Sequence, residues 1–313
     1  MMTFSNAVLE AMVRRYRPNG RLSITPIASG KFNSSYWVQV GDEPLVLRIA
    51  PPNDAVYVFY EAKMMRQEPS LHARLRAETT VPVPEIVAFD DAQTVVDRDY
   101  MLLRRLPGRP LSEMPHVNKA EVLRQVGECL AQVHRLTAVQ HGYLGEHHPM
   151  QPQDSWAAAF VIMWYKLVDD VVAQGFYDAA ESRYLRHLLD HHLPLFDRPV
   201  TSRLLHMDVW AQNILVDDSG TLTGLLDWDR ALWGDPEIEF AVLDYCGISE
   251  PPFWAGYGQP RDWSPAAQIR QRFYLLYELQ KYIVIRNGRL YDPIAAQRYK
   301  EQAWRIVWQI PYQ

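Results

Sequence analysis

The spacing of apolar residues changes at the segment LPGRP (residues 106–110), and this change constrains the fold more than any other feature. Before it, the runs LSITPIA, SSYWVQV, PLVLRIA, VPVPEIVAFDD, TVVDRD and YMLLRRL predict strands, and residues 56–78 have helical spacing. After it, apolar residues recur three and four apart over most of the chain. We therefore expect an α+β protein with a small antiparallel sheet and one helix in residues 1–106. Residues 107–313 should be mainly helical, with a helical insertion at about 145–200.

The helical part contains one region with strong strand signals, residues 203–227. The runs RLLH, NILVDD and SGTLTGLLD predict strands, and the last two form a hairpin that turns at residues 218–220. Such a hairpin brings Asn213, which starts its first strand, close to Asp227, which ends its second. Asp208 lies five residues before Asn213, on the preceding loop. Amide and carboxylate oxygens at short range suit a hard cation such as Mg²⁺.

The stretch HMDVWAQN (residues 206–213), followed by an acid after the hairpin, resembles the catalytic loop and metal-binding aspartate of the protein-kinase-like fold. The segments LLHMDVWAQNILVD and LLDWDRALWGDPEIEFA resemble the corresponding segments of the small-molecule branch of this fold, the aminoglycoside phosphotransferase and choline kinase family. The resemblance covers most of residues 20–245. IASGKFNSSYWVQV resembles the strand–loop–strand that covers the nucleotide phosphates, and YMLLRRLPGRPL resembles the hinge against which adenine stacks. The resemblance implies a two-lobed kinase-like fold that uses Mg²⁺ and ATP, with GTP left open.

The resemblance also implies roles for individual residues. Asp208 would orient the acceptor hydroxyl and take its proton, while Asn213 and Asp227 would hold Mg²⁺. Arg48 would contact the α- and β-phosphates and pair with Glu61, which is expected in the helix that follows the strand of Arg48. A loose transition state makes much of this work positioning and charge neutralisation.

Further roles concern the nucleotide and the catalytic loop. Main-chain groups of Arg104 and Leu106 would hydrogen-bond the base, and Asn33 would help to position the loop over the phosphates. His206 would brace the catalytic loop through hydrogen bonds and would not transfer protons.

Some residues depart from the family's pattern. Arg48 stands where protein kinases have lysine, but arginine keeps the charge and can fork onto a carboxylate or a phosphate. The loop SGKFNSS lacks the glycine pattern of protein kinases, as the small-molecule branch commonly does. Glu239 stands where many relatives have aspartate, which puts a structural contact in question. Asp229 is a second candidate metal ligand, but strand alternation predicts that it points away.

The charge of the chain bears on its partners. The net charge of -5, without a basic run, gives no support to nucleic-acid binding. Residues 1–106 hold 13 basic and 12 acidic residues and residues 107–313 hold 19 and 25, so the negative excess lies in the second part. Acids there (Asp169, Asp170, Asp178, Glu250 and Asp262) favour a cationic small acceptor. The lack of a long apolar run or an export signal, together with two isolated cysteines, predicts a cytoplasmic protein without a membrane span.

Three functions compete at this point. The first is an ATP-dependent O-phosphotransferase acting on a small hydroxylated molecule, for which an aminoglycoside-type antibiotic or a choline-, sugar-, amino-alcohol- or macrolide-like compound remains open. The second is a pseudokinase that binds nucleotide without catalysis. The third is a metal-dependent hydrolase with His206, Asp208 and Asp227 as ligands, which would leave the first part of the chain unexplained.

Overall fold

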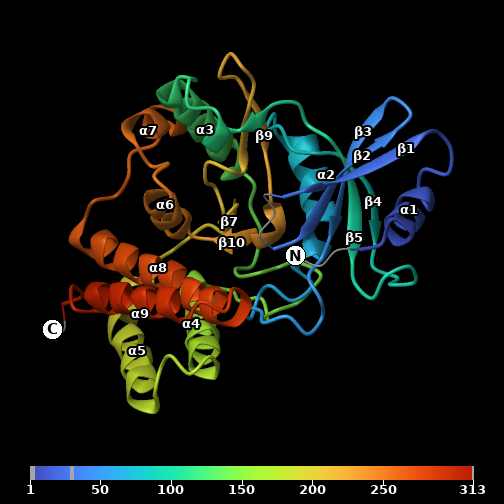
Figure 1. Cartoon of the computed structure of the whole chain (residues 1–313). Helices are drawn as coiled ribbons and strands as arrows, with labels where there is room; N and C mark the ends of the chain where they lie inside the picture. The colour runs from blue at the N-terminus through green and yellow to red at the C-terminus, as the bar shows by residue number, and fades with distance from the viewer. Residues whose placement is uncertain (1–3, 29–31, 312–313) are drawn as a thin grey trace.

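A computed structural model describes residues 4–28 and 32–311 and shows two lobes, a sheet-based N-terminal lobe and a larger helical C-terminal lobe (Figure 1). The expected α+β, kinase-like architecture is confirmed. Within the described ranges, no helix is long and apolar enough to cross a membrane.

The N-terminal lobe is built on a five-stranded antiparallel sheet in the order β1-β2-β3-β5-β4. Its strands are β1 (Leu22–Ile27), β2 (Ser34–Val40), β3 (Glu43–Ile49), β4 (Ile86–Asp90) and β5 (Tyr100–Arg104). In β2, buried Tyr36, Val38 and Val40 alternate with outward-facing residues, as in a strand with one face on a core. Helix α1 (Asn6–Arg14) packs Leu9, Met12 and Val13 against that face.

Helix α2 (Glu68–Glu78) is the helix expected in this lobe, but it begins later than the helical spacing suggests. A 3₁₀ turn (Met64–Gln67) precedes it, and residues 51–63 form loop and turns. The strand expected at TVVDRD is wrong. Residues 91–99 form an irregular connection in which buried Asp99 accepts a hydrogen bond from Arg66 Nε at 2.7 Å, so these polar groups are satisfied by side chains instead of a strand ladder.

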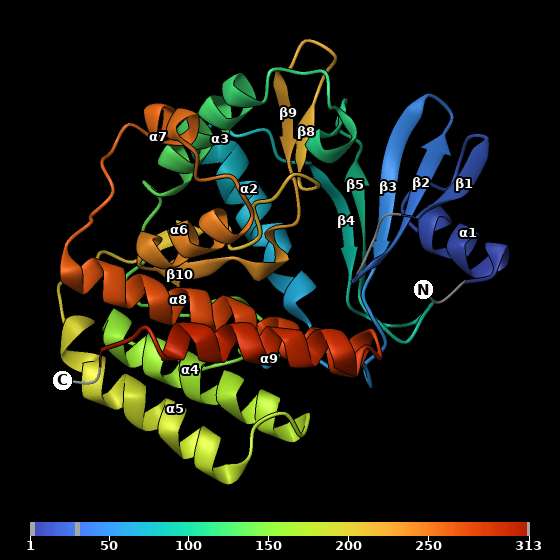
Figure 2. The same ribbon diagram turned by 60° about the vertical axis from the view of Figure 1, so that its left-hand side comes forward.

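The C-terminal lobe is mainly helical. Its helices are α3 (Lys119–Val133), α4 (Trp156–Ala173), α5 (Ala179–His192), α6 (Pro236–Tyr245), α7 (Pro251–Tyr257), α8 (Pro265–Val284) and α9 (Pro293–Val307). Figure 2 shows α4, α5, α8 and α9 stacked together at one end of this lobe. Their facing side chains form the largest apolar core of the molecule, in which Phe160, Trp164 and Phe273 are fully buried. A π-helical turn (Ile285–Arg289) extends α8.

The predicted hairpin of the C-terminal lobe is confirmed. Strands β8 (Ile214–Val216) and β9 (Leu222–Leu225) pair antiparallel, and β6 (Arg109–Pro110) joins β8 on its other edge. Gly220 lies in the turn at φ 81°, a left-handed conformation that glycine adopts readily. Strands β7 (Arg203–Leu205) and β10 (Leu232–Gly234) form a second small sheet. The loop between β7 and β8 and the residues after β9 therefore meet at one place.

The two lobes are linked in two ways. The chain leaves β5 at Arg104 and enters the C-terminal lobe at β6, close to the predicted division after residue 106, which itself stays a prediction. In addition, Val58 and Tyr60, which follow β3, are buried in the apolar core of the C-terminal lobe. A segment of the first lobe thus interlocks with the second.

Candidate functional site

The loop between β7 and β8 carries Asp208 and contains a residue in an unfavourable conformation. Met207 has φ 65°, a left-handed value that costs a non-glycine residue on the order of 1 kcal/mol or more. Its N–H donates to Glu239 Oε1 at 2.7 Å, and the second oxygen of Glu239 lies 2.6 Å from His134 Nε2. Burial alone would raise the pKa of Glu239, but the bond from His134 holds it below its ordinary value. Glu239 therefore supplies the structural contact that its departure from aspartate put in question.

His206 holds the same loop from the other side, as expected. Its Nδ1 accepts from the Asp208 N–H at 3.2 Å, so its proton lies on Nε2, which donates to the Leu226 carbonyl at 2.8 Å. Burial lowers the pKa of this histidine, which keeps it neutral. The ring thus ties the loop that carries Asp208 to the strand end that precedes Asp227.

Asp208 presents a carboxylate whose two oxygens are both held. Oδ1 accepts from Arg230 Nη1 at 3.0 Å, and Oδ2 accepts from Asn213 Nδ2 at 2.9 Å. Burial favours the neutral acid, but the cations Arg230 and Lys281 outweigh it and lower the pKa of Asp208. Its side chain is still 28% exposed, so an ionised and oriented carboxylate faces solvent.

Asn213 and Asp227 lie beside each other, as the hairpin predicts. Leu226 N–H donates to the Asn213 carbonyl at 2.9 Å, and Asp227 follows at φ 62° with its side chain 43% exposed. The amide nitrogen of Asn213 is directed to Asp208, which makes the amide oxygen the atom available to a cation. Asp208, Asn213 and Asp227 are therefore brought together.

Arg48, on β3, is buried and faces three carboxylates. Its guanidinium lies 2.9 Å from Glu68, 3.0 Å from Asp227 and 3.2 Å from Asp229. The expected pairing with Glu61 is wrong. The connection from β3 to α2 is long and irregular, so Glu68 at the start of α2 takes this position, and Glu61 pairs elsewhere.

Asp229 does not point away from the site, contrary to the strand-based expectation. It lies on a 3₁₀ turn (Trp228–Arg230), buried, and accepts from Asn33 Nδ2 at 3.3 Å as well as from Arg48. Asn33, predicted to position the loop over the phosphates, therefore reaches the acid cluster. Burial, together with neighbouring carboxylates, raises the pKa of Asp229 and of Asp227.

This donor set fits a divalent cation. One guanidinium faces three carboxylates, and carboxylate and amide oxygens are the ligands that Mg²⁺ takes, usually together with phosphate and water. In the part of the chain that the structure describes, no three His, Cys, Asp or Glu residues form a closed metal cage.

At the predicted hinge, one main-chain group already takes part in a hydrogen bond within the protein. Arg104 N–H donates to the Glu85 carbonyl at 2.9 Å, so only its carbonyl is available to a base, and its side chain pairs with the Glu85 carboxylate at the surface. Leu106 follows in the linker to β6. The contacts of both residues with a base stay predictions.

A buried charge network behind Asp208 was missed in the sequence. Arg230 bonds Asp208 with one nitrogen and Glu278 Oε2 with the other at 3.1 Å, and Lys281 pairs with the second oxygen of Glu278. The Arg230 guanidinium also lies 5.6 Å from the centre of the Tyr60 ring. Little in the sequence indicated this network. Glu278 and Lys281 are three residues apart on α8, a spacing that is also common for ion pairs on the exposed face of a helix.

The acids expected to attract a cationic acceptor are engaged elsewhere. Asp178 caps α5, Asp262 bonds Ser264 at the start of α8, Glu250 pairs with Lys119 and Asp169 pairs with Arg186. Asp170 accepts from the Phe59 N–H. These residues therefore give no support to a cationic acceptor.

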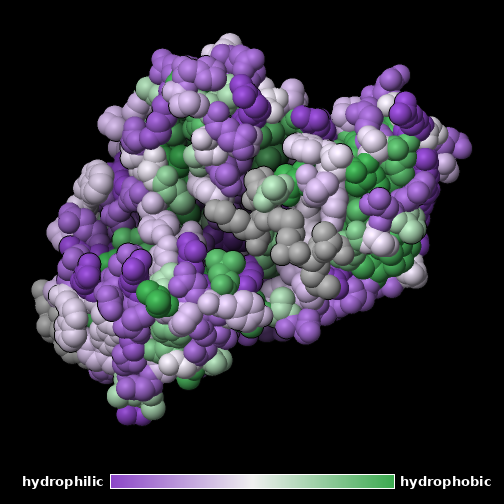
Figure 3. Space-filling view, viewed as in Figure 1, coloured by the Kyte–Doolittle hydropathy of each residue, from purple (hydrophilic) through white to green (hydrophobic). Residues whose placement is uncertain are grey.

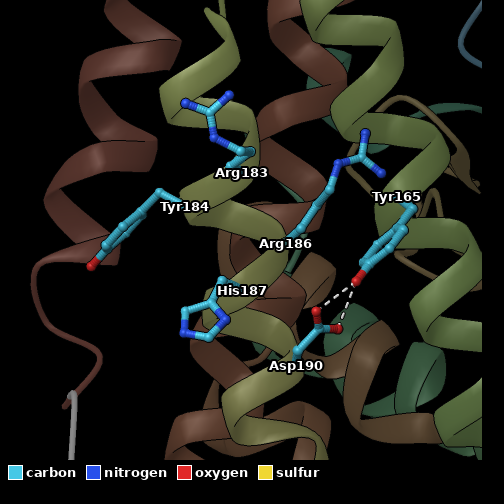
Figure 4. Close-up of a pocket in the computed structure, with 6 residues that line it drawn as sticks. All are labelled: Tyr165, Arg183, Tyr184, Arg186, His187 and Asp190. Atoms are coloured by element: carbon cyan, nitrogen blue, oxygen red, sulfur yellow. Dashed lines mark hydrogen bonds between the residues drawn. The ribbon is translucent and has the colours of Figure 1, made fainter.

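The hollows of the surface include two that bear on the location of the site. Figure 3 shows one between the lobes, with hydrophilic residues in its depth. The other lies on α4 and α5, where the Tyr165 hydroxyl bonds both oxygens of Asp190 at 2.6 and 2.8 Å (Figure 4). Its lining residues are Tyr165, Arg183, Tyr184, Arg186, His187 and Asp190. None of them belongs to the cluster around Asp208, so this pocket is separate from the candidate site.

Comparisons with known proteins found relatives in sequence and in fold. A "Probable ketoamine kinase" of Vibrio parahaemolyticus is 26% identical over 84% of this chain and 86% of that protein. Hygromycin-B 4-O-kinase of Escherichia coli is 26% identical over 69% of this chain and 60% of that protein. A thermostable aminoglycoside phosphotransferase APH(4)-Ia, in ternary complex with AMP-PNP and hygromycin B, has a TM-score of 0.65 at 21% identity, over 95% of this chain and 98% of that chain.

A candidate fructosamine-3-kinase from Haemophilus somnus has a TM-score of 0.70 at 17% identity, over 97% of each chain, and shows the same fold. The sequence profile described as "Phosphotransferase enzyme family" matches residues 23–268, most of the chain. The chain belongs to the phosphotransferase enzyme family.

Proposed function

We propose that this protein transfers the γ-phosphoryl group of ATP to a hydroxyl of a small molecule, with Asp208 as the base that orients the hydroxyl and takes its proton. The observation that carries the proposal is the state of Asp208. Its carboxylate is ionised, fixed at both oxygens and beside an acid cluster in which one guanidinium, that of Arg48, faces three carboxylates. This is the arrangement that phosphoryl transfer needs, because positioning and charge neutralisation dominate its catalysis.

The roles of the remaining residues follow from their contacts. Asn213 and Asp227 would hold Mg²⁺, with Asp229 as a further oxygen donor behind them. The bound cation would neutralise phosphate charge. Arg48 would exchange Asp227 for a phosphate oxygen while Glu68 keeps its other nitrogen in place. Arg104 and Leu106 would contact the base.

The acceptor is proposed to be a sugar-like amine, either a ketoamine or an aminoglycoside such as hygromycin B. Support comes from the names of the relatives, which act on compounds of these two kinds. The acceptor would enter on the side of Asp208 that faces α8. An ATP-dependent reaction and the two free cysteines, Cys129 and Cys246, favour a cytoplasmic location.

The two competing functions are less well supported. A hydrolase with His206 as a metal ligand conflicts with its hydrogen bonds, since both ring nitrogens are engaged by backbone groups. A pseudokinase function does not account for the carboxylate of Asp208, which is ionised and held by hydrogen bonds at both oxygens.

The test is Mg²⁺-dependent release of ADP from ATP against a panel of ketoamines, aminoglycosides including hygromycin B, choline-type amines and sugar alcohols. We expect one class to stimulate release and Asp208→Ala to abolish the stimulation while nucleotide still binds. Asp208→Asn keeps the shape of the side chain and should be equally inactive. Normal product formation by either variant would refute the assigned role of Asp208.

A further inference from the structure

Glu61 was expected beside Arg48, yet it lies in a segment with a different task. Residues 56–61, here named the clasp segment, leave the N-terminal lobe and dock on the C-terminal lobe. Phe59 N–H donates to Asp170 Oδ2 of α4 at 2.7 Å, and the Tyr60 ring stacks on Tyr143 with centres 4.7 Å apart. Within the segment, Glu61 Oε2 accepts from the Val58 N–H at 2.8 Å, so Glu61 also fixes the shape of the segment.

Arg289 meets Glu61 from the C-terminal lobe. It is the last residue of the π-helical turn after α8, and its Nη2 lies 2.9 and 2.8 Å from the two oxygens of Glu61. Glu61 is buried, and the Arg289 side chain is only 15% exposed, so water screens this ion pair weakly. The turn approaches the segment so closely that a Cβ on Gly288 would lie 2.3 Å from Val56 Cγ1.

The same guanidinium reaches the loop between β1 and β2. Arg289 Cζ lies 4.5 Å from the centre of the Phe32 ring, which also packs edge-on against Tyr57 at 6.2 Å. Asn33, the next residue, donates to Asp229 in the acid cluster. A continuous set of contacts therefore runs from α8 through Arg289 and Phe32 to the cation site.

We propose that Glu61 and Arg289 are positioning residues that fix Phe32 and Asn33, the described residues before β2, beside the nucleotide phosphates. This inference rests on the proposed function. Glu61 orients the guanidinium, the guanidinium holds the Phe32 ring, and the ring sets the place of Asn33 at Asp229. Nucleotide affinity in this protein then depends on a contact supplied by the acceptor-side helix α8.

Helix α8 also holds the other half of the site. Glu278 and Lys281, on the same helix, fix Arg230 against Asp208. Helix α8 and the π-helical turn that extends it therefore hold residues on both sides of the site. They fix Arg230 against Asp208, and they contact Phe32 next to Asn33.

The first experiment measures binding of Mg²⁺·AMP-PNP by calorimetry in the absence of acceptor. Arg289→Met removes both the ion pair and the cation–π contact, and we expect the Kd for AMP-PNP to rise about threefold to thirtyfold. Arg289→Lys retains a charge for Glu61 but not the planar stack on Phe32, so it should recover part of the affinity. Asn287→Ala is the matched control: it removes a 3.1 Å bond to Gln174 from the same turn and should leave the Kd unchanged.

A role of the Glu61–Arg289 ion pair that is limited to holding the two lobes together would give a different result. It would lower the melting temperature of all three variants without a selective loss of nucleotide affinity. A double-mutant cycle of Arg289→Met with Phe32→Leu addresses this, because loop seating predicts that the two losses overlap and are not additive. If Arg289→Met does not fold, Glu61→Gln and Phe32→Leu provide the same readout, each with an expected rise in the Kd.

Steady-state kinetics add a second readout. The KM for ATP should rise more than kcat falls, whereas Asp208→Ala should lose kcat and keep nucleotide affinity. An Arg289→Met variant that is folded and binds AMP-PNP like the unaltered protein would overturn this inference alone. An unaltered protein that binds no nucleotide would instead remove the proposed function, and this inference with it.

Discussion

Arg230→Met is the substitution that best tests the electrostatic account of Asp208. Arg230 is buried and gives Asp208 its strongest favourable charge contact, 3.0 Å between Nη1 and Oδ1. Methionine has a similar length and no charge, so the cavity stays filled while the contact is lost. Burial would then act on Asp208 with less opposition, and its pKa should rise.

The size of this rise can be worked from the geometry. The centres of the two charges lie about 4 to 5 Å apart, and an effective dielectric constant of about 20 gives an attraction of about 4 kcal/mol. Lys281 remains nearby and Asp208 is partly exposed to water, so only part of this energy is lost. One pKa unit corresponds to about 1.4 kcal/mol, so the loss of part of this attraction should raise the pKa of Asp208.

The assay is the pH dependence of kcat/KM for the acceptor. Because the pKa of Asp208 is lowered in the folded protein, activity should be present at neutral pH and lost as the pH falls through that value. In Arg230→Met this acid limb should move to higher pH, and kcat should fall by about 10- to 100-fold because Asp208 also loses a fixed orientation.

Two controls separate this effect from general damage. Arg109→Met removes an ion pair of nearly the same length, 3.1 Å to Asp218, whose side chains are 55% and 86% exposed, and it should change nothing. Arg230→Lys should restore part of the shift. An acid limb that stays in place in a folded Arg230→Met protein would show that Arg230 does not govern the ionisation of Asp208.

Three further substitutions test the surrounding structure by chemical and thermal unfolding. Glu239→Ala leaves the Met207 N–H and His134 without their buried partner, so we expect a loss of about 3 kcal/mol or more in unfolding free energy and a slower enzyme. Asp170→Asn should stabilise the protein by on the order of 1 kcal/mol above pH 6 after allowance for its partial exposure. Burial raises the pKa of Asp170 to about 6, so its stabilising contribution is complete at low pH and is lost as pH rises through 6; an unchanged pH profile of stability would contradict this. Gly256→Ala would place a Cβ 1.9 Å from the Arg124 carbonyl where α7 meets α3, and should destabilise by about 1–3 kcal/mol; a stable variant would mean that these helices can separate.

Local patterns predicted the part of the site that lies close together in the chain. Asp208, Asn213 and Asp227 are joined by one loop and one hairpin, so their proximity follows from strand pairing alone. The residue before the hairpin and the residue after it must be neighbours whatever the rest of the molecule does. His206 belongs to the same local unit, and its bracing bonds were expected from the resemblance to the kinase-like family.

The partner of Arg48 could not be found in this way, because apolar spacing has more than one cause. Residues from Val56 onward look like one face of a helix, yet Val58 and Tyr60 are apolar because they enter the core of the other lobe. The helix begins ten residues later than Val58, and the acid that faces Arg48 moves from Glu61 to Glu68. Periodicity reports burial, and burial in a distant lobe cannot be told from burial along a helix.

The distribution of charge explains why the site has two parts. Around Arg48, one cation faces Glu68, Asp227 and Asp229, an excess of negative charge that a divalent ion would balance. Around Asp208, the cations Arg230 and Lys281 balance Asp208 and Glu278. A base has to stay ionised before and after a metal-bound nucleotide arrives, so its charge is best compensated by the protein itself. The proposed metal site needs the opposite arrangement, because carboxylates whose charge is not balanced by the protein attract a cation.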